Sequence, residues 1–270
     1  MESTPNSEHE ALPSTKPVAP YQGGKRNLAK RLCAKIADTP HKLYAEPFVG
    51  MGGVFLKRQS RPRSEIINDI SADVTTLFRI LQRHYVPFIE MLRYQLTSRS
   101  EFERLKETNP DTLTDLERAA RFLYLQRLAF GGKVSSRNFG VSPGLGARFN
   151  LTKLIPMLED LHERLSGVTI ERMTYSAFIN RYDRSTTLFY IDPPYFGCEK
   201  VYGDGVFDRD DFVRLSSQLQ QISGRFILSI NDVDIIRELF RWATIESVEL
   251  TYTISGGSNS KRARELIITN

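Results

Sequence analysis

The tetrapeptide Asp192-Pro193-Pro194-Tyr195 carries residue types that could hold an amino group on an aromatic ring. It directly follows the apolar run Leu188–Ile191, and its prolines fix the backbone and remove two N–H donors. The Asp192 carboxylate and the Pro193 carbonyl can accept both hydrogens of such an amine, while the Tyr195 ring offers a stacking face. Those hydrogen bonds free the nitrogen lone pair, so we predict in-line methyl transfer to an exocyclic amine, driven by positioning and electrostatics. The alternative is a structural proline turn at the end of a strand.

A glycine loop, Gly50–Gly53, follows a second predicted strand, Leu43–Phe48. Glycines let a backbone turn sharply and lie close to a ligand, and open α/β sheets bind ligands at the carboxyl ends of their strands. No G-x-x-x-x-G-K-[ST] motif is present, which argues against a triphosphate. Asp69 ends the predicted strand Glu65–Ile70, at a distance typical of a ribose ligand. The loop suits S-adenosylmethionine, an adenosine with a sulfonium and no phosphate, although a tight turn in an unrelated α/β enzyme is the alternative.

Predicted strands and helices alternate at both ends of the chain, which indicates helices packed on a mostly parallel sheet. Apolar and alternating runs predict strands at Leu43–Phe48, Glu65–Ile70, Val168–Met173, Leu188–Ile191, Arg225–Ile230, Ser247–Ile254 and Glu265–Thr269. Helical spacing is found at 28–36, 71–96, 208–222 and 232–242, and a helix is expected to begin at Val54.

The middle third of the chain has a different character, because it is mostly helical with an irregular segment rich in Gly, Ser and Pro at 131–146. We therefore expect one α/β domain built from 19–72 and 166–270, with a helical insertion at 73–165. The first 18 residues contain prolines and polar residues with almost no apolar content, which predicts a disordered tail.

Charge is unevenly distributed along the chain, whose formal net charge is +5. No Asp or Glu occurs from Arg118 to Asn150 or from Lys16 to Lys35, and cations gathered in this way suit the phosphates of DNA. A loop or hairpin at 131–146 could enter a groove, with Arg137 and Asn138 as candidates for reading base edges. A solvated helix face and an ordinary loop are the alternative. The candidate DNA-binding residues are Arg118, Arg121, Arg127, Lys133, Arg137, Asn138 and Arg148.

Over about residues 19–270 the chain resembles the Dam-type DNA adenine methyltransferases, the alpha group of amino-methyltransferases. Tyr21–Lys25 is similar to the family's aromatic-x-Gly-Gly-Lys opening, and Ala45–Gly53 to its Glu-Pro-Phe-x-Gly-x-Gly loop. Ile67–Ile70 is similar to its Asn-Asp motif, and Ala120–Phe130 to the helix before its DNA-reading hairpin. Asp192–Tyr195 resembles the catalytic motif, and the motifs occur in the family's order.

The resemblance implies a Rossmann-like class I methyltransferase fold with a seven-stranded mixed sheet, whose last strand, Glu265–Thr269, is antiparallel. It implies methylation at N6 of an adenine that is flipped out of double-stranded DNA, with the insertion as the target-recognition domain. The implied contacts to S-adenosylmethionine are Tyr21, Gly23, Gly24, Lys25, Glu46, Phe48, Gly50, Gly52, Asp69 and Asp192. The implied catalytic residues are Asp192, Pro193, Pro194 and Tyr195.

The chain departs from the family pattern where the family reads DNA, so its recognition sequence is not predicted. Gln126 replaces the usual Asn, Phe130–Lys133 replaces a typical Phe-Asn-Gly-Leu, and Tyr21 stands where Trp is common. The alternatives are a methyltransferase of the same fold acting on cytosine N4, RNA or a protein amide, and a DNA-binding module without catalysis. Asp at position 192, instead of Ser or Asn, favours adenine, and the basic insertion favours DNA.

Other features argue against several classes of protein. The two cysteines, Cys33 and Cys198, and the four histidines lack metal-ligand spacing, so we expect reduced thiols and no metal site. No apolar run reaches membrane-spanning length and no signal pattern begins the chain. We expect a cytoplasmic protein of a bacterium or a phage-infected cell, active as a monomer.

Overall fold

A seven-stranded sheet in the order β5-β4-β2-β6-β7-β9-β8 forms the centre of the computed structural model, which describes residues 9–25, 27–140, 146–199, 203, 205–253 and 260–270. The strands are β2 (Leu43–Glu46), β4 (Ser64–Asn68), β5 (Thr169–Glu171), β6 (Thr187–Ile191), β7 (Arg225–Asn231), β8 (Thr244–Thr253) and β9 (Ser260–Thr269). Neighbours from β5 to β7 pair in parallel, whereas β9 is antiparallel to both β7 and β8. The predicted α/β fold with a mixed sheet and an antiparallel last strand is confirmed.

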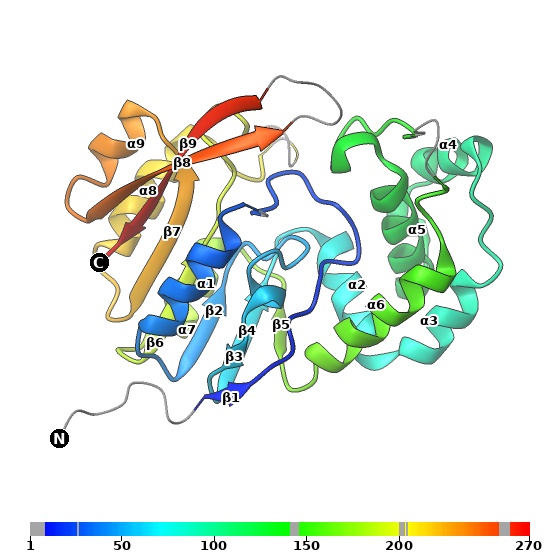
Figure 1. Cartoon of the computed structure of the whole chain (residues 1–270), viewed down its shortest axis with the longest axis horizontal. Coiled ribbons are helices and arrows are strands. Elements are labelled where there is room, and N and C mark those ends of the chain that lie inside the picture. The colour runs from blue at the N-terminus through cyan, green and yellow to red at the C-terminus, as the bar shows by residue number, and fades with distance from the viewer. Residues whose placement is uncertain (1–8, 26, 141–145, 200–202, 204, 254–259) are drawn as a thin grey trace.

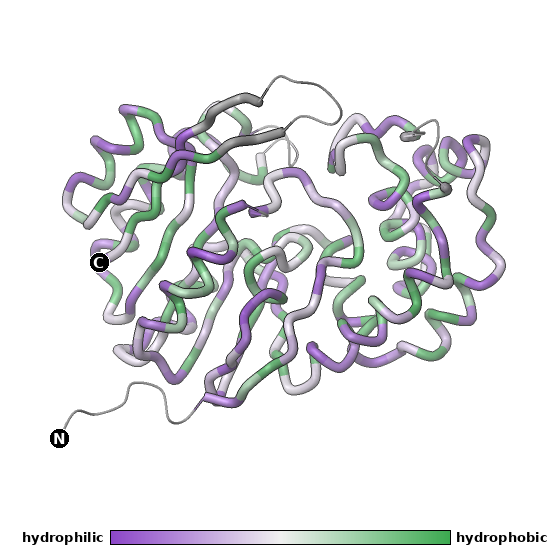
Figure 2. Tube along the Cα trace, in the orientation of Figure 1, coloured by the Kyte–Doolittle hydropathy of each residue, from purple (hydrophilic) through white to green (hydrophobic). Residues whose placement is uncertain are grey.

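Helices cover both faces of the sheet, which explains why its central strands are continuous apolar runs (Figure 1). Leu188 and Tyr190 of β6 belong to an apolar cluster that includes residues of α1 (Ala29–Asp38). Phe189 and Ile191 belong to a second cluster with α7 (Tyr175–Tyr182), α8 (Arg209–Leu219) and α9 (Asp234–Leu239). Figure 2 shows that apolar residues occur along the length of these central strands.

The middle of the chain lies to one side of the sheet and is helical (Figure 1). Its elements are α2 (Ala72–Arg83), α3 (Tyr85–Leu92), α4 (Arg99–Glu107), η2 (Pro110–Thr112), α5 (Asp115–Leu128), η3 (Phe130–Gly132) and α6 (Leu151–Arg164). One apolar cluster runs from α1 and β2 through α2 to α5 and α6, so the helical part shares its core with the sheet. That this part recognises DNA stays a prediction.

The helix expected over 71–96 is two helices, because His84 takes a non-helical conformation (φ −131°, ψ 38°) between α2 and α3. The α-helix expected to begin at Val54 is also absent from the described residues, and a 3-10 turn takes its place. The glycine loop leads into a single 3-10 turn, η1 (Phe55–Lys57), and then into the short strand β3 (Ser60–Arg61). Arg58 ends that turn because its backbone is extended. Its side chain donates a buried 2.6 Å hydrogen bond to Glu65 of β4.

The prediction of a disordered tail at 1–18 is wrong for the described residues 9–18. Residues Glu10–Ala11 form β1, which pairs antiparallel with β3. Further along, the Thr15 N–H donates to the Leu56 carbonyl at 2.9 Å, and Val18 is fully buried. Backbone pairing and a few buried side chains therefore order a segment whose composition is mostly polar. Residues 1–8 lie outside the described part of the chain.

Candidate active site

The carboxyl ends of β2, β4 and β6 meet at a cavity of about 1350 Å³, where open α/β sheets bind their ligands. The opening motif reaches the same cavity from the start of the chain. The predicted catalytic and cofactor-binding residues that line it are Tyr21, Gly23, Gly24, Lys25, Glu46, Phe48, Gly50, Asp69, Asp192 and Pro194, and two predicted DNA-binding residues, Arg127 and Arg137, line it as well. Gly52, Pro193 and Tyr195 belong to the same loops without lining the cavity. The fold thus gathers most of the predicted residues around one space.

Lys25 joins the opening motif to the tetrapeptide after β6. Its Nζ lies 2.8 Å from Asp192 Oδ1 and donates a 2.5 Å hydrogen bond to the Tyr195 hydroxyl. Glu265 of β9 places Oε2 at 3.6 Å from the same nitrogen. The Lys25 side chain is 2% exposed, so water screens these attractions weakly. One buried ammonium therefore fixes the orientation of both Asp192 and Tyr195.

Asp192 keeps an acceptor at the edge of the cavity, with 20% of its side chain exposed. Burial raises its pKa to about 6, and the Lys25 charge opposes that rise. The Ser229 hydroxyl donates to Asp192 Oδ1 at 3.4 Å and shares a 2.8 Å hydrogen bond with the Tyr190 hydroxyl. Since this pKa lies below neutrality, Asp192 is mostly ionised at neutral pH and can accept hydrogen bonds.

Asn231, at the end of β7, holds the backbone that follows the tetrapeptide. The Phe196 N–H donates to Asn231 Oδ1 at 2.9 Å, and Asn231 Nδ2 donates to the Phe196 carbonyl at 3.1 Å. This paired contact positions the chain directly after Tyr195. Sequence analysis missed Asn231, because only the parallel pairing of β6 and β7 brings it beside the tetrapeptide.

Glu46 is a second buried carboxyl in the cavity, at the end of β2. Burial raises its pKa to about 8, the Tyr44 hydroxyl lowers it by donating a 2.6 Å hydrogen bond to Oε2, and the charge of Asp192 raises it. At neutral pH Glu46 therefore holds a proton while Asp192 is charged. A cationic ligand entering the cavity would favour the ionised form of Glu46.

Asp69 and Asn68, at the end of β4, fix the shape of the loops around the cavity. Asp69 Oδ2 accepts the Gly50 N–H and Oδ1 accepts the Ser71 N–H, each at 2.9 Å. Asn68 Nδ2 donates to the carbonyls of Pro47 (2.9 Å) and Met173 (3.0 Å). Burial raises the pKa of Asp69 to about 6, and both N–H groups oppose the rise. Asp69 thus has a loop-shaping role besides its predicted contact with a ribose.

Gly50 has two reasons to be glycine. Its φ is +50°, and a Cβ at this position would lie 3.1 Å from the Tyr21 ring. We expect Gly50→Ala to lower the free energy of unfolding by about 1–2 kcal/mol through backbone strain alone, and to weaken cofactor binding by displacing Tyr21. Urea unfolding and a cofactor titration measure the two effects. Gly146→Ala, where the added Cβ meets open space, is the control, and equal losses in both variants would contradict this reading of the loop.

Comparison with known proteins adds to this geometry. A model of the D12 class N6 adenine-specific DNA methyltransferases matches residues 21–254, which is more than half of the chain. This chain belongs to that family. It is therefore an adenine-specific DNA methyltransferase, and its cofactor is S-adenosylmethionine.

Named relatives of this D12 methyltransferase are modestly similar over most of their length. The type II methyltransferase M1.LlaDCHI of Lactococcus lactis subsp. cremoris is 26% identical, and the alignment covers 94% of this chain and 95% of the relative. The type II methyltransferase M.CviBI of Paramecium bursaria Chlorella virus NC1A is 23% identical, with coverages of 83% and 86%. A precorrin 8w decarboxylase structure from Methanobacterium thermoautotrophicum aligns at a TM-score of 0.43 and 11% identity, covering 99% of this chain and 100% of that one.

The cavity of the D12 methyltransferase also contains an aromatic cluster, of which sequence analysis found Phe48 but missed Tyr175 and Phe207. Phe48 stacks on Tyr175 with ring centroids 5.5 Å apart, and Phe207 packs edge-on against Phe48 at 5.9 Å. The Tyr175 hydroxyl donates to Asp211 Oδ1 at 2.8 Å. The available signal was the position of Tyr175, shortly after β5 and thus at the same edge of the sheet. These rings and the carboxylates around them fit an adenosine with a cationic centre.

Most of the arginines predicted to bind DNA also make contacts within the fold of the D12 methyltransferase. Arg121 is buried, and its Nε donates to the Leu105 carbonyl at 2.7 Å. Arg118 pairs with Asp73 at 2.6 Å and with Asp111 at 2.8 Å. The guanidinium groups of Arg118 and Arg121 therefore have partners within the protein, and their contact with DNA phosphates stays a prediction.

Arg127 is likewise engaged, since it donates to the Arg148 carbonyl at 2.9 and 3.0 Å and also to the Val18 carbonyl. Arg148 places an Nη1 atom close to Gly140. Arg137 lines the cofactor cavity, whereas Lys133 and Asn138 are exposed. The insertion of the D12 methyltransferase thus presents fewer available cations than its composition indicates.

The irregular segment of the D12 methyltransferase begins and closes as a hairpin. The Phe130 N–H donates to the Asn138 carbonyl at 2.9 Å, and the Gly140 N–H donates to the Leu128 carbonyl at 2.8 Å. This agrees with the expectation of a hairpin or loop at 131–146, of which 141–145 lie outside the described residues. We call residues 130–138 the recognition loop, after the DNA-reading role that the sequence predicts for this segment.

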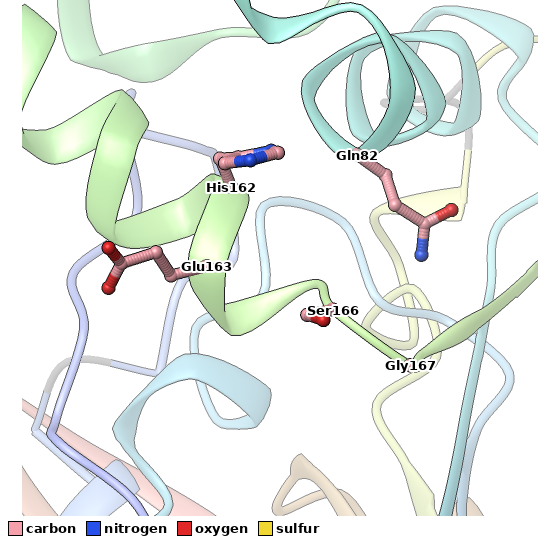
Figure 3. Close-up of a pocket in the computed structure, with 5 residues that line it drawn as sticks. All are labelled: Gln82, His162, Glu163, Ser166 and Gly167. Carbon is pink, nitrogen blue, oxygen red and sulfur yellow. The ribbon is translucent and has the colours of Figure 1, made fainter.

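A second cavity of the D12 methyltransferase, of about 460 Å³, lies between α2 and the end of α6 (Figure 3). It is lined by Gln82, His162, Glu163, Ser166 and Gly167. Gln82 donates to the carbonyls of Leu165 and Val168, and His162 forms a hydrogen bond with the Leu81 carbonyl. Both side chains are therefore engaged in hydrogen bonds that stabilise the fold. Within the described residues we find no group of three or more potential metal ligands, and none of their helices is long and apolar enough to span a membrane.

Proposed function

We propose that the enzyme holds its target adenine outside the duplex and that Asp192, Pro193 and Tyr195 bind the base. The observation that carries this proposal is the buried Lys25 ammonium, at 2.8 Å from Asp192 and 2.5 Å from the Tyr195 hydroxyl. Asp192 is mostly covered by protein, so a base inside a DNA stack could not reach it. Pro194 contributes by fixing the backbone between these groups.

The residues around the cavity suit the steps of the reaction. S-adenosylmethionine, when bound, supplies a methyl group on a positively charged sulfur. Asp192 accepts one hydrogen of the adenine amine and the Pro193 carbonyl accepts the other, which frees the nitrogen lone pair and aims it at the methyl group. As the new N–C bond forms, the S–C bond breaks and its electron pair leaves with S-adenosylhomocysteine; the methylated nitrogen then releases one proton to water. The Asp192 charge stabilises the positive charge that develops on nitrogen.

We further propose that double-stranded DNA lies against the recognition loop, with Lys133 as a phosphate contact and Asn138 as a base-reading candidate. Both side chains are exposed. Arg137 and Arg148 stay candidates, although Arg137 lines the cavity and donates to Gln126. Fewer cations are available to DNA than the acid-free composition suggests, because Arg118, Arg121 and Arg127 make hydrogen bonds and ion pairs within the protein.

Lys133→Ala should weaken binding to all duplexes alike and lower the slope of log K against log salt by about 1, since one phosphate contact is lost. Salt titrations of DNA binding measure both effects. Lys42→Ala is the matched control, because Lys42 is exposed and precedes β2, at the edge of the sheet opposite the cavity. An unchanged salt slope in Lys133→Ala would remove Lys133 from the DNA surface.

The proposed reaction can be tested directly with labelled S-adenosylmethionine, duplex DNA and digestion to nucleosides. We expect label in N6-methyladenine. Label in N4-methylcytosine, RNA or protein would point to another substrate of the same fold, and no label with intact DNA binding would indicate a silent module.

We also propose a monomer that acts in the cytoplasm of a bacterium or a phage-infected cell. Two of its relatives support this setting, because they come from Lactococcus lactis and from the Escherichia phage P1, whose DNA N-6-adenine-methyltransferase is 23% identical over 82% of this chain and 30% of that protein. Sedimentation of the free enzyme and of its DNA complex would test the oligomeric state.

A further inference from the structure

Gln126 of α5 is fully buried and contacts three segments of the chain at once. Its Nε2 donates to the Pro20 carbonyl and to the Gly132 carbonyl, each at 2.8 Å. Its Oε1 accepts a 3.1 Å hydrogen bond from Arg137 Nη2. One side chain therefore links residues 20–25, which we call the opening segment, to both the start and the end of the recognition loop.

Other contacts join the same segments. The Gln22 N–H donates to the Gly132 carbonyl at 3.0 Å. Gly132 has a φ of +67°, and a Cβ there would lie 3.0 Å from the Pro20 carbonyl carbon and 3.1 Å from the Tyr21 nitrogen. The two backbones thus pack too closely for any side chain at position 132. A displacement of the recognition loop at Gly132 must consequently move the chain at Pro20–Gln22, or break these contacts.

The opening segment leads from this junction directly into the active site. Tyr21 places its ring against Gly50 of the glycine loop, and Lys25 reaches Asp192 and Tyr195. Contacts therefore run from the recognition loop through Gln126 and residues 20–25 to the catalytic tetrapeptide.

We infer that Gln126 is a positioning residue that couples the recognition loop to the cofactor cavity. The inference rests on the proposed contact of the recognition loop with DNA. When DNA moves or orders the loop, Gln126 transmits the change to Tyr21 and Lys25, so binding of DNA and of cofactor become linked. By linkage, each ligand then alters the affinity of the other by the same factor.

The chain offers a matched control for a role in folding alone. Gln82 is also a glutamine whose Nε2 donates to two backbone carbonyls, those of Leu165 and Val168, each at 2.8 Å. It lies beside the second cavity, away from the cofactor cavity (Figure 3). Gln82→Met and Gln126→Met remove the same kind of contact and leave side chains of similar length.

The experiment measures binding of S-adenosylhomocysteine, which cannot be turned over, with and without a duplex that the enzyme methylates. We expect the duplex to change this affinity by about 5-fold or more in the wild type, as is typical of coupled sites. Gln126→Met should abolish that factor and Gln126→Asn should keep part of it, while Gln82→Met keeps all of it. Thermal unfolding confirms that each variant is folded.

No coupling in the wild type, full coupling in Gln126→Met, or equal loss in Gln82→Met would each overturn the inference. The DNA contact of the loop is judged separately from the salt slope of Lys133→Ala. If that slope is unchanged while Gln126→Met still loses coupling, the relay stands and the assigned phosphate contact fails. If the slope changes and coupling persists in Gln126→Met, the contact stands and the relay fails.

Discussion

Asp192→Ala should lower the rate of methyl transfer to adenine by at least about 10²–10³-fold, the loss typical when one preorganised polar group is removed from an active site. The substitution deletes the acceptor that holds the amine and the charge that stabilises developing positive charge on nitrogen. It also leaves Lys25 without its 2.8 Å partner. Binding of duplex DNA should stay largely intact, because the proposed phosphate contact lies in the recognition loop.

A matched substitution separates this effect from the loss of any carboxylate. Asp232 follows β7 as Asp192 follows β6, and it pairs with Arg237 at 2.6 Å outside the cavity. We expect Asp232→Ala to transfer methyl groups at nearly the wild-type rate. Single-turnover rates with saturating cofactor and DNA measure the chemical step. Wild-type transfer by Asp192→Ala would refute the role assigned to this carboxylate.

The sheet could be predicted from the sequence because its central strands are covered on both faces. Burial on both sides makes β6 a continuous apolar run, and the strand is buried from Thr187 to Ile191. The cofactor loop and Asp192 follow such strands immediately, so knowing the strands also predicts which side chains meet at the edge of the sheet. The predicted α/β architecture and the predicted site residues that follow β2, β4 and β6 rest on this one regularity.

Composition could not predict which charges are available to a ligand. The stretch from Arg118 to Asn150 contains no acidic residue, yet Arg118 pairs with Asp73 and Asp111, which lie outside it. Arg121 donates to two backbone carbonyls of α4. Backbone carbonyls satisfy the hydrogen-bond donors of a guanidinium group without cancelling its charge, and a count of charges does not reveal them. Composition also failed to predict the ordered segment before residue 19. Val18 is buried there, but the apolar residues of this segment show no helix or strand periodicity.

Contacts between distant segments were the other hidden feature. Asn231 and Gln126 each bond backbone groups that the sequence gives no reason to place nearby. Tyr175 reaches the cavity because α7 begins just after β5, and α7 was not predicted. Residues of this kind position the catalytic groups without belonging to a motif, so only the fold identifies them.

Lys25→Met should slow transfer at neutral pH and move the acidic limb of the kcat profile to higher pH. In the wild type the pKa of Asp192 is about 6, since burial raises it and the Lys25 charge lowers it. In the proposed reaction Asp192 must be ionised, so activity should fall as the pH drops through the pKa that this carboxyl group has in the bound complex. Removing the ammonium leaves burial and Glu265, which raise the pKa of Asp192, opposed only by the hydrogen bond from Ser229. The half-maximal pH should therefore rise by about 1–3 units, the range by which a nearby opposite charge shifts a carboxyl group.

The profile of kcat, measured with saturating DNA and cofactor, reports groups in the bound complex and is insensitive to weaker binding. Lys35→Met is the control, because Lys35 pairs with Glu246 at 3.0 Å on the surface and should leave the profile unchanged. A lower rate with an unmoved acidic limb would mean that Lys25 acts by orienting Asp192 and Tyr195 alone. A limb displaced towards lower pH would contradict the sign of the electrostatic argument, since loss of a cation cannot favour ionisation of the carboxyl group beside it.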